Sequence, residues 1–320
     1  MNKNWFILGL VLLLGSVFLL SGCIQEDQTS NLDQKLIVTS ISPLADLIKN
    51  VGGDEIEVIH LVPEGSDPHT FEPTPDAIRS LTAARIFFAN GVGQENYLER
   101  LIKNAQNPSL ITVVLSEGLE ILGVETKEEE HEHNSDHDHD DHGHDHSQGN
   151  PHLWLSVENS QKYVEKIRDT LIEIYPESQE IFAANAENYL KELRDLDRWI
   201  KEQISTIPEE NREVIVHHDA WAYYASSYGL NIRSSIVHSE EGEPSAQEYA
   251  QVINLIKDHN IKGIFSEVGF NTKIVQQIAN ETNANIIHDL YSDTLGSTPH
   301  TDSYIDIMKY NTLRIVEGLS

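Results

Sequence analysis

The sequence predicts an α/β protein with two βα lobes, each built on a parallel four-stranded sheet and joined by a long, rigid connecting helix. Short β-branched segments alternate with helical patterns from Lys35 onward, which favours parallel sheets. The alternation gives four strands, stops for a helical middle section, and then gives four more. A chain of 320 residues is long enough for about two domains.

The first lobe is expected to alternate four strands with three helices. Pro43 fits the first turn of the first helix, and Gly52 and Gly53 fit its end. Pro75 opens a second helix in the same way. The strands are expected at residues 35–41, 55–62, 85–90 and 110–115, and the third helix at residues 96–106.

The middle section is expected to be helical. Residues 157–175 form one amphipathic stretch, and a longer one covers residues 177–206, where apolar residues mostly recur at steps of three and four. About thirty helical residues would span ~45 Å. That length reaches along both lobes, so we predict a stiff connector. The alternative is two ordinary helices with a break near Asp195.

The second lobe repeats the pattern of the first. Its strands are expected at residues 213–217, 231–238, 261–267 and 284–290, and its helices at residues 219–228, 245–259, 271–282 and 303–319. We therefore place the N-terminal lobe at residues 35–176, the connecting helix at 177–206 and the C-terminal lobe at 207–320.

The first residues have the pattern of an export signal. Lys3 precedes an apolar run that ends in Leu-Ser-Gly-Cys at Cys23, the chain's single cysteine. This ending resembles the lipobox of prokaryotic lipoproteins, which implies cleavage after residues 1–22 and acylation of Cys23. The alternative is an uncleaved transmembrane anchor, since the run is near the ~17-residue lower limit. Either way the remainder lies outside the cytoplasm, and residues 23–34 are expected to be a flexible tether.

The charge is strongly acidic. The formal net charge is −30, which argues against binding nucleic acid or an anionic membrane surface. Residues 125–146 hold ten acidic residues and one lysine, so the rest of the chain still carries −21. Cations should therefore be attracted to this protein.

Four residues could hold a metal ion in the cleft between the lobes. His69 lies in the loop VPEGSDPHTFEPTPD, which four prolines stiffen. His152 lies in NPHLWL, and His218 and Asp293 follow the fifth and eighth predicted strands. Ligands bind at the carboxyl ends of the strands in open α/β sheets. Two candidates come from each half of the chain, so a shared ion would tie the lobes together.

These residue types favour a tetrahedral transition metal. Three imidazoles and one carboxylate form an N3O set that suits Zn²⁺. Four protein ligands leave no open position for an activated water, which argues against an enzyme. A zinc-dependent hydrolase stays an alternative if Asp293 does not bind the metal.

Five stretches in order resemble the zinc and manganese solute-binding proteins of ABC importers, the cluster A-I or TroA-like family. They are GSDPHTFEPTPD, NPHLWL, HHDAWAYYASSYGL, GEPSAQE and DLYSDTL. The resemblance implies two α/β lobes, a long rigid connecting helix and a metal in the cleft. It implies the ligands His69, His152, His218 and Asp293. The family's motif has its third ligand directly before Asp-Ala, which favours His218 over His217.

The resemblance also implies the function. The protein would bind Zn²⁺ and deliver it to the membrane subunits of an ABC permease. Manganese importers of the family tend to have Glu at the third ligand position, and the softer His218 favours zinc. A manganese- or iron-binding member of the same family is an alternative, and so is a surface adhesion lipoprotein. We expect a monomer, held at the membrane by a lipid on Cys23.

A histidine-rich stretch, HEHNSDHDHDDHGHDH, occupies residues 131–146. Residues 125–149 contain almost no apolar side chains, so we predict a disordered loop in the metal-free state. Similar loops occur in the zinc-importing branch of the family, which favours zinc and implies that the loop is not the transport site itself. Our hypothesis is that the loop is an auxiliary element that captures zinc beside His152. The alternative is a solvated acidic insert with incidental metal affinity. The histidines concerned are His131, His133, His137, His139, His142, His144 and His146.

Overall fold

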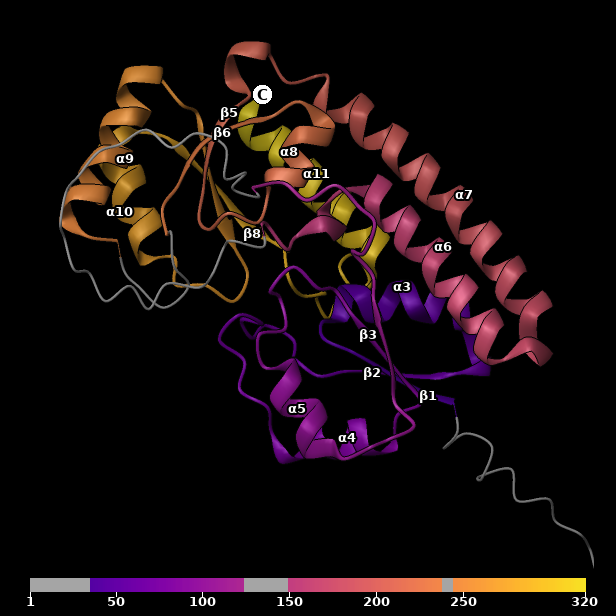
Figure 1. Ribbon diagram of the computed structural model, residues 1–320. Helices are drawn as coiled ribbons and strands as arrows, with labels where there is room; N and C mark the ends of the chain where they lie inside the picture. Colours follow the sequence, from indigo (N-terminus) through magenta and orange to yellow (C-terminus); the bar gives the residue numbers. More distant parts are fainter. Residues whose placement is uncertain (1–34, 124–148, 238–243) are drawn as a thin grey trace, which may run out of the picture.

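The computed structural model describes residues 35–123, 149–237 and 244–320. The predicted signal sequence, Cys23, the tether and the histidine-rich loop lie outside these residues. Among the described helices, none combines the length and the apolar character that crossing a membrane requires. The described chain forms two α/β lobes with a pair of long helices along one side (Figure 1).

The first lobe contains a parallel four-stranded sheet in the order β2-β1-β3-β4. Its strands are β1 (Leu36–Thr39), β2 (Glu57–His60), β3 (Ile86–Ala89) and β4 (Ile111–Val114). Its helices are α3 (Ser42–Gly52), α4 (Pro75–Ala83) and α5 (Leu98–Ala105). Prolines begin α3 and α4 as predicted, and the Thr74 hydroxyl accepts a hydrogen bond from the Ala77 N–H at the start of α4.

The second lobe repeats this arrangement with the sheet order β6-β5-β7-β8, again parallel. Its strands are β5 (Glu213–Val216), β6 (Asn231–Ser235), β7 (Gly263–Glu267) and β8 (Asn285–Leu290). Its helices are α8 (Ala222–Tyr228), α9 (Ala246–His259), α10 (Lys273–Thr282) and α11 (Tyr304–Leu319). The predicted fold class is confirmed, and the strands are shorter than predicted by a few residues at their ends.

The long connecting helix is continuous. Helix α6 (Val157–Ile174) is followed by a 3-10 turn at Pro176–Ser178 and then by α7 (Gln179–Ile204). Helix α7 passes Asp195 without interruption, so the alternative of a break there is wrong. Its 26 residues span ~39 Å, and it runs along both lobes beside α6 (Figure 1).

One hydrophobic core extends through both lobes. A single cluster of buried side chains runs from the α3 face of the first sheet through α6 and α7 to α8 and α11 of the second lobe. Helix α7 contributes the fully buried side chains of Leu193 and Ile200, among others, to this cluster. Separate clusters cover the outer sheet faces under α4 and α5, and under α9 and α10. Sliding the lobes would therefore require repacking of this shared core.

Loops of the two lobes also meet directly. The Leu295 N–H donates to the Ser42 hydroxyl at 2.9 Å, and the Gly65 N–H donates to the Thr294 hydroxyl at 3.2 Å. Gly269 has a φ of +93°, and a Cβ there would lie 3.1 Å from the Gly65 carbonyl oxygen. Glycine thus permits both the backbone conformation and the close approach.

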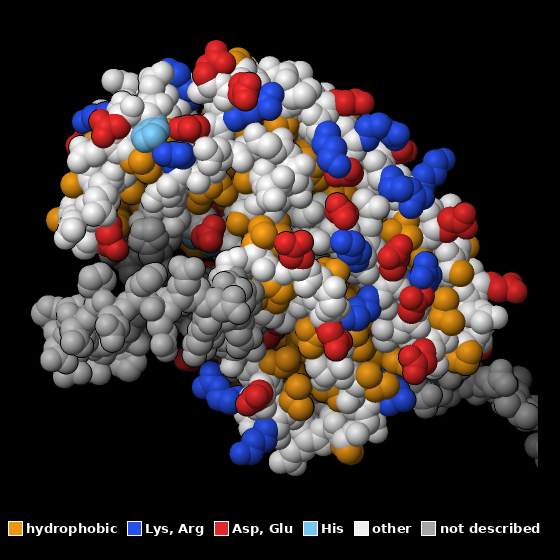
Figure 2. Space-filling model, turned by 45° about the horizontal axis from the view of Figure 1, so that its top comes forward, with side chains coloured by type: hydrophobic (Ala, Val, Ile, Leu, Met, Phe, Trp, Pro, Cys, Tyr) orange, Lys and Arg blue, Asp and Glu red, His pale blue; other side chains and the backbone are white. Residues whose placement is uncertain are grey.

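The outer face over α6 and α7 mixes acidic and basic side chains (Figure 2). Lys162 pairs with Glu158 at 3.3 Å and Lys201 with Asp197 at 2.7 Å, each at an i,i+4 spacing. Such exposed pairs stabilise a helix by only about 0.3–0.5 kcal/mol each. The stability of these helices therefore comes mainly from their buried face.

Candidate metal centre

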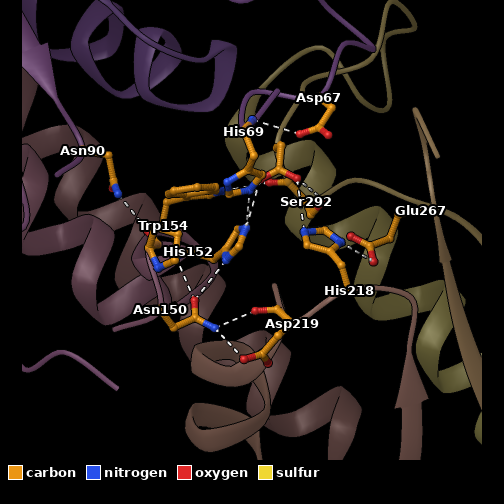
Figure 3. A network of polar contacts seen from close by, with 12 residues as sticks. Asp67, His69, Asn90, Asn150, His152, Trp154, His218, Asp219, Glu267 and Ser292 are labelled. Atoms are coloured by element: carbon orange, nitrogen blue, oxygen red, sulfur yellow. Dashed lines mark hydrogen bonds and ion pairs between the residues drawn. The ribbon is translucent and has the colours of Figure 1, made fainter. Parts of the chain in front are cut away.

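The four predicted ligand residues converge between the lobes. One possible ligand atom from each of His69, His152, His218 and Asp293 lies within 4.8 Å of all the others. The Nε2 atoms of His69 and His152 are 3.2 Å apart, and Asp293 lies 3.5 Å from His152 Nε2 and 3.6 Å from His218 Nε2. Figure 3 shows the imidazoles directed toward one another from different elements.

All four side chains come from loops at or near the carboxyl ends of the parallel strands. His69 lies between β2 and α4, and His152 precedes a 3-10 turn at Leu153–Leu155. His218 lies two residues after β5, and Asp293 three residues after β8. His152, His218 and Asp293 are buried, whereas His69 is only half-buried. An ion would thus have His69 on the side nearest to solvent.

The loop that carries His69 is held locally. The Asp67 carboxylate accepts a hydrogen bond from the His69 backbone N–H at 2.9 Å and another from the Thr70 hydroxyl at 3.3 Å. Asp side chains commonly bond two residues onward and stabilise a turn in this way. The turn places the His69 ring beside the His152 ring, with centroids 5.1 Å apart.

Asn150 orients His152. Its side-chain oxygen lies 3.0 Å from both the backbone nitrogen and the ring Nδ1 of His152. An amide oxygen only accepts, so Nδ1 donates to Asn150, while Nε2 faces His69 and Asp293. The Asn150 amide nitrogen donates to the Asp219 carbonyl of the second lobe at 2.5 Å. Asn150 therefore links the His152 ring to the segment that follows His218 (Figure 3).

Glu267 orients His218. The Nδ1 atom of His218 lies 3.0 Å from Oε1 of Glu267, the last residue of β7. The carboxylate accepts a hydrogen bond from the Nδ1–H group, which leaves Nε2 directed to the cluster. Burial of Glu267 would raise its pKa, but the charge and hydrogen bond of His218 lower it overall. The Glu267 carboxyl is therefore held in its anionic form.

Asp293 is a buried carboxyl with capacity to bind a cation. Its Oδ2 accepts a hydrogen bond from the Ser292 hydroxyl at 2.8 Å, and among the described residues its Oδ1 receives none. Burial raises the pKa of Asp293, although the charges of His218 and His69 oppose this. A bound dication would replace a proton as the partner of this carboxylate.

Trp154 connects the segments that carry His152 and Asp293. Its indole N–H donates to the Ser292 carbonyl at 2.8 Å, and its own carbonyl accepts from the Tyr304 hydroxyl at 2.7 Å. The indole also lies beside the His152 ring, with centroids 5.3 Å apart. Trp154 is fully buried, so it fixes the Asp293 segment against the His152 segment.

His217 does not join the four-residue cluster. It forms a separate group with His218 and Glu267, and its ring packs on Phe270 with centroids 5.0 Å apart. Burial lowers the pKa of His217, which favours its neutral form. In the part of the chain that the structure describes, His60, His259, His288 and His300 join neither group.

Sequence reasoning missed Asn150, Glu267 and Trp154. Two of them flank His152 in Asn150-Pro151-His152-Leu153-Trp154, so proximity to a candidate ligand was an available signal. Glu267 was harder to find, because only the sheet order places the end of β7 beside the end of β5.

The arrangement can hold one small cation, and four protein ligands would leave no coordination position for a reacting water. Three imidazole Nε2 atoms and one carboxylate converge from both lobes, which is the N3O donor set of a closed tetrahedral site. The site residues fit a transition metal better than Ca²⁺ or Mg²⁺, which prefer oxygen ligands.

Known proteins agree with this picture. The chain matches the profile of a family described as zinc-uptake complex component A, periplasmic, over residues 37–318. It is 33% identical over 305 residues to a manganese-binding lipoprotein, MntA, of Halalkalibacterium halodurans, with 94% of each chain covered. It is 27% identical over 320 residues to the manganese ABC transporter substrate-binding lipoprotein PsaA of Streptococcus anginosus, covering 97% of this chain and 98% of that one.

Solved structures give the same result. A Mn-bound periplasmic metal-binding protein from Candidatus Liberibacter asiaticus superposes with a TM-score of 0.75 at 25% identity, covering 90% of this chain and all of that one. The periplasmic zinc-binding protein TroA from Treponema pallidum has a TM-score of 0.75 at 22% identity, over 90% and 99% of the two chains. The second likeness concerns the fold alone.

Proposed function

The chain belongs to the zinc-uptake complex component A family, and from that premise we propose that it captures Zn²⁺ and delivers it to an ABC-type permease. Members of the family are metal-binding proteins of ABC importers and not enzymes, and they work outside the cytoplasm. What is proposed for this chain is the metal, the ligands, the lipid anchor and the monomeric state.

The convergence of His69, His152, His218 and Asp293 carries the proposal. The four residues are far apart in the sequence, yet their ligand atoms come within 4.8 Å of one another. The Nε2 atoms of His152 and His218 face the cluster, because the Nδ1 atoms donate to Asn150 and Glu267. A cation held there would have ligands from both lobes, which suits a carrier that must present its cargo as a single rigid unit.

Zinc is favoured by the donor set. Nitrogen donors outnumber oxygen donors three to one, and imidazole suits Zn²⁺ while carboxylate and water suit Mn²⁺. The second candidate is manganese, and the observation behind it is that several relatives carry manganese in their names. Because Zn²⁺ binds more tightly than Mn²⁺ to most such sites, affinity for zinc alone does not separate the two.

The decisive experiment is a competition titration with both metals. The full-length chain in detergent is compared with a variant that lacks residues 128–147 and with His218→Glu. The proposal expects one tight Zn²⁺ site in both the wild type and the deletion, and Mn²⁺ binding that His218→Glu strengthens relative to zinc. His217→Glu is the matched control. Tight Mn²⁺ binding by the wild type, with no gain in His218→Glu, would favour the manganese candidate.

The histidine-rich loop is proposed to capture zinc for this site. Its seven histidines and its acidic residues would bind several ions weakly and raise their local concentration beside His152. Deleting residues 128–147 should slow zinc uptake by cells under scarcity without removing the tight site. Unchanged uptake would leave the loop as a solvated insert.

The proposed lipid anchor is tested separately. Cys23→Ala should release the protein from the membrane fraction into the medium or the periplasm, because one acyl-bearing cysteine is the proposed attachment. Metal titration of the released protein should be unchanged. Membrane retention of Cys23→Ala would favour an uncleaved apolar anchor.

A further inference from the structure

Glu267 is the most deeply buried charged group beside the metal centre, and its role goes beyond the proposed ligand set. Its side chain is fully buried, with none of its surface exposed. Burying an ionised carboxylate is expensive unless a partner compensates for the lost water. The His218 ring nitrogen Nδ1 lies 3.0 Å from Oε1 of Glu267, so an imidazole N–H faces this buried carboxylate.

The two buried histidines of the centre have unlike supports. Behind His152 stands Asn150, a neutral amide whose oxygen lies 3.0 Å from Nδ1. Behind His218 stands Glu267, an anion at the same distance. Both acceptors fix the same tautomer, but only Glu267 adds charge. A neutral acceptor would have been sufficient for orientation alone.

The added charge matches that of the cargo. Asp293 provides one negative charge among the four ligand residues, and the three imidazoles provide none when neutral. A dication at this buried place would therefore retain one uncompensated positive charge. Glu267 supplies the second negative charge one side chain further out, through the His218 ring. A carboxylate behind a metal-bound imidazole also makes the ring a stronger donor.

We propose that Glu267 is a positioning and charge-matching residue, which fixes the His218 Nε2 toward the ion and supplies the second negative charge for a buried dication. The inference rests on the proposed function, because it concerns the same site. It does not make Glu267 a metal ligand. The residue acts through His218, and its effect is a higher affinity for divalent transition metals than the four ligands give alone.

The neighbouring His217 offers the competing arrangement. His217, His218 and Glu267 have ligand atoms within 4.8 Å of one another, and among the described residues His217 Nδ1 has no hydrogen bond. A second ion there would take its ligands from the Glu267 carboxylate itself and from His218 Nδ1. That ion would compete with the Nδ1 proton that Glu267 accepts, so the two roles for Glu267 exclude each other.

Two substitutions separate charge from position. Glu267→Gln keeps an acceptor oxygen for His218 Nδ1 and removes the charge, whereas Glu267→Ala removes both. Glu213→Gln is the matched control. Glu213 begins β5, the strand that leads to His218, so this substitution removes the same charge at the opposite end of the strand. All are made in the full-length chain in detergent, and a chelator suppresses the weak sites.

The first measurement is Zn²⁺ affinity by calorimetry. Loss of a support behind a metal-bound histidine typically weakens binding by about 10- to 100-fold. Glu267→Gln is expected near the lower end of that range and Glu267→Ala near the upper end, with Glu213→Gln equal to wild type. Wild-type affinity in Glu267→Gln would overturn the proposal. Two tight ions per chain in the wild type, with one lost in His217→Gln, would overturn it in favour of a direct ligand.

The second measurement distinguishes positioning from a general loss of structure. One equivalent of Co²⁺ should give the intense visible absorption of a tetrahedral site in wild type, in Glu213→Gln and in Glu267→Gln. Glu267→Ala should lose intensity because His218 is no longer oriented. A wild-type spectrum in Glu267→Ala would contradict the positioning role. If the wild type itself shows no tight metal site, the proposed function fails instead, and the two failures are thereby distinguishable.

Discussion

Asn150 offers a quantitative test of how the two lobes are linked at the centre. Its side chain makes two hydrogen bonds with His152 and donates to the Asp219 carbonyl at 2.5 Å and to the Asp219 carboxylate at 3.2 Å. Asn150→Ala would remove all four contacts. The substitution leaves the His152 ring free to rotate and leaves polar groups of both lobes without their partner.

The expected magnitude follows from these contacts. A buried polar group that loses its partner costs about 1–3 kcal/mol. We expect the free energy of unfolding to fall by about 2–4 kcal/mol. Zn²⁺ affinity should fall by about 10-fold, as for other residues that orient a metal-bound histidine.

Urea denaturation of the metal-free protein and calorimetric titration with Zn²⁺ measure the two effects. Asn107→Ala is the matched control, because the Asn107 amide donates to the Leu81 and Ala84 carbonyls at 3.0 and 2.7 Å within the first lobe only. The control should lose stability and keep its metal affinity. If Asn150→Ala also keeps wild-type affinity while losing stability, the reasoning about His152 is refuted.

Three further predictions follow from the fold and the centre. His218→Gln should weaken Zn²⁺ binding by at least about 100-fold and His217→Gln by less than about 3-fold in the same titration, since only His218 faces the four-residue cluster; equal losses would contradict this assignment. Leu193→Ala, in the fully buried face of α7, should lower the free energy of unfolding by about 2–5 kcal/mol in urea denaturation, and a loss below about 1 kcal/mol would contradict the shared core. The Ser178 hydroxyl and then Lys35 lower the pKa of Glu55, so the stability from this carboxylate is present above the unfolded pKa near 4.5 and is lost as the pH falls through the lower folded value. The stability difference between wild type and Ser178→Ala should therefore shrink on acidification below pH 4.5, and a constant difference would refute the linkage.

Much of the fold could be predicted because its signals are local. The strands are short β-branched runs buried on both faces, as β1 and β3 are, and prolines mark the first turns of α3 and α4. The continuous helix α7 was predictable from its apolar periodicity. Strand ends were less predictable, because pairing with the neighbouring strands decides where a strand begins and stops. Lys35, for example, was predicted in the first strand, but the pairing of β1 begins at Leu36.

Of the candidate centre, only the four proposed metal ligands could be predicted from the sequence. His69, His152, His218 and Asp293 follow from the carboxyl-end rule and from motif resemblance, and the structure brings them together; their role as metal ligands stays a prediction. Glu267 was harder to predict, because only the sheet order β6-β5-β7-β8 places it beside His218. The histidine-rich loop and the lipid anchor at Cys23 lie outside the described residues and also stay predictions.

Whether one ion binds between the lobes can be seen in an anomalous difference map from a crystal of the protein loaded with one equivalent of Zn²⁺. We predict one strong peak between the lobes, about 2.0–2.2 Å from the Nε2 atoms of His69, His152 and His218 and from an oxygen of Asp293. A peak bonded to His217 and Glu267, or one whose coordination is completed by water in place of Asp293, would contradict it.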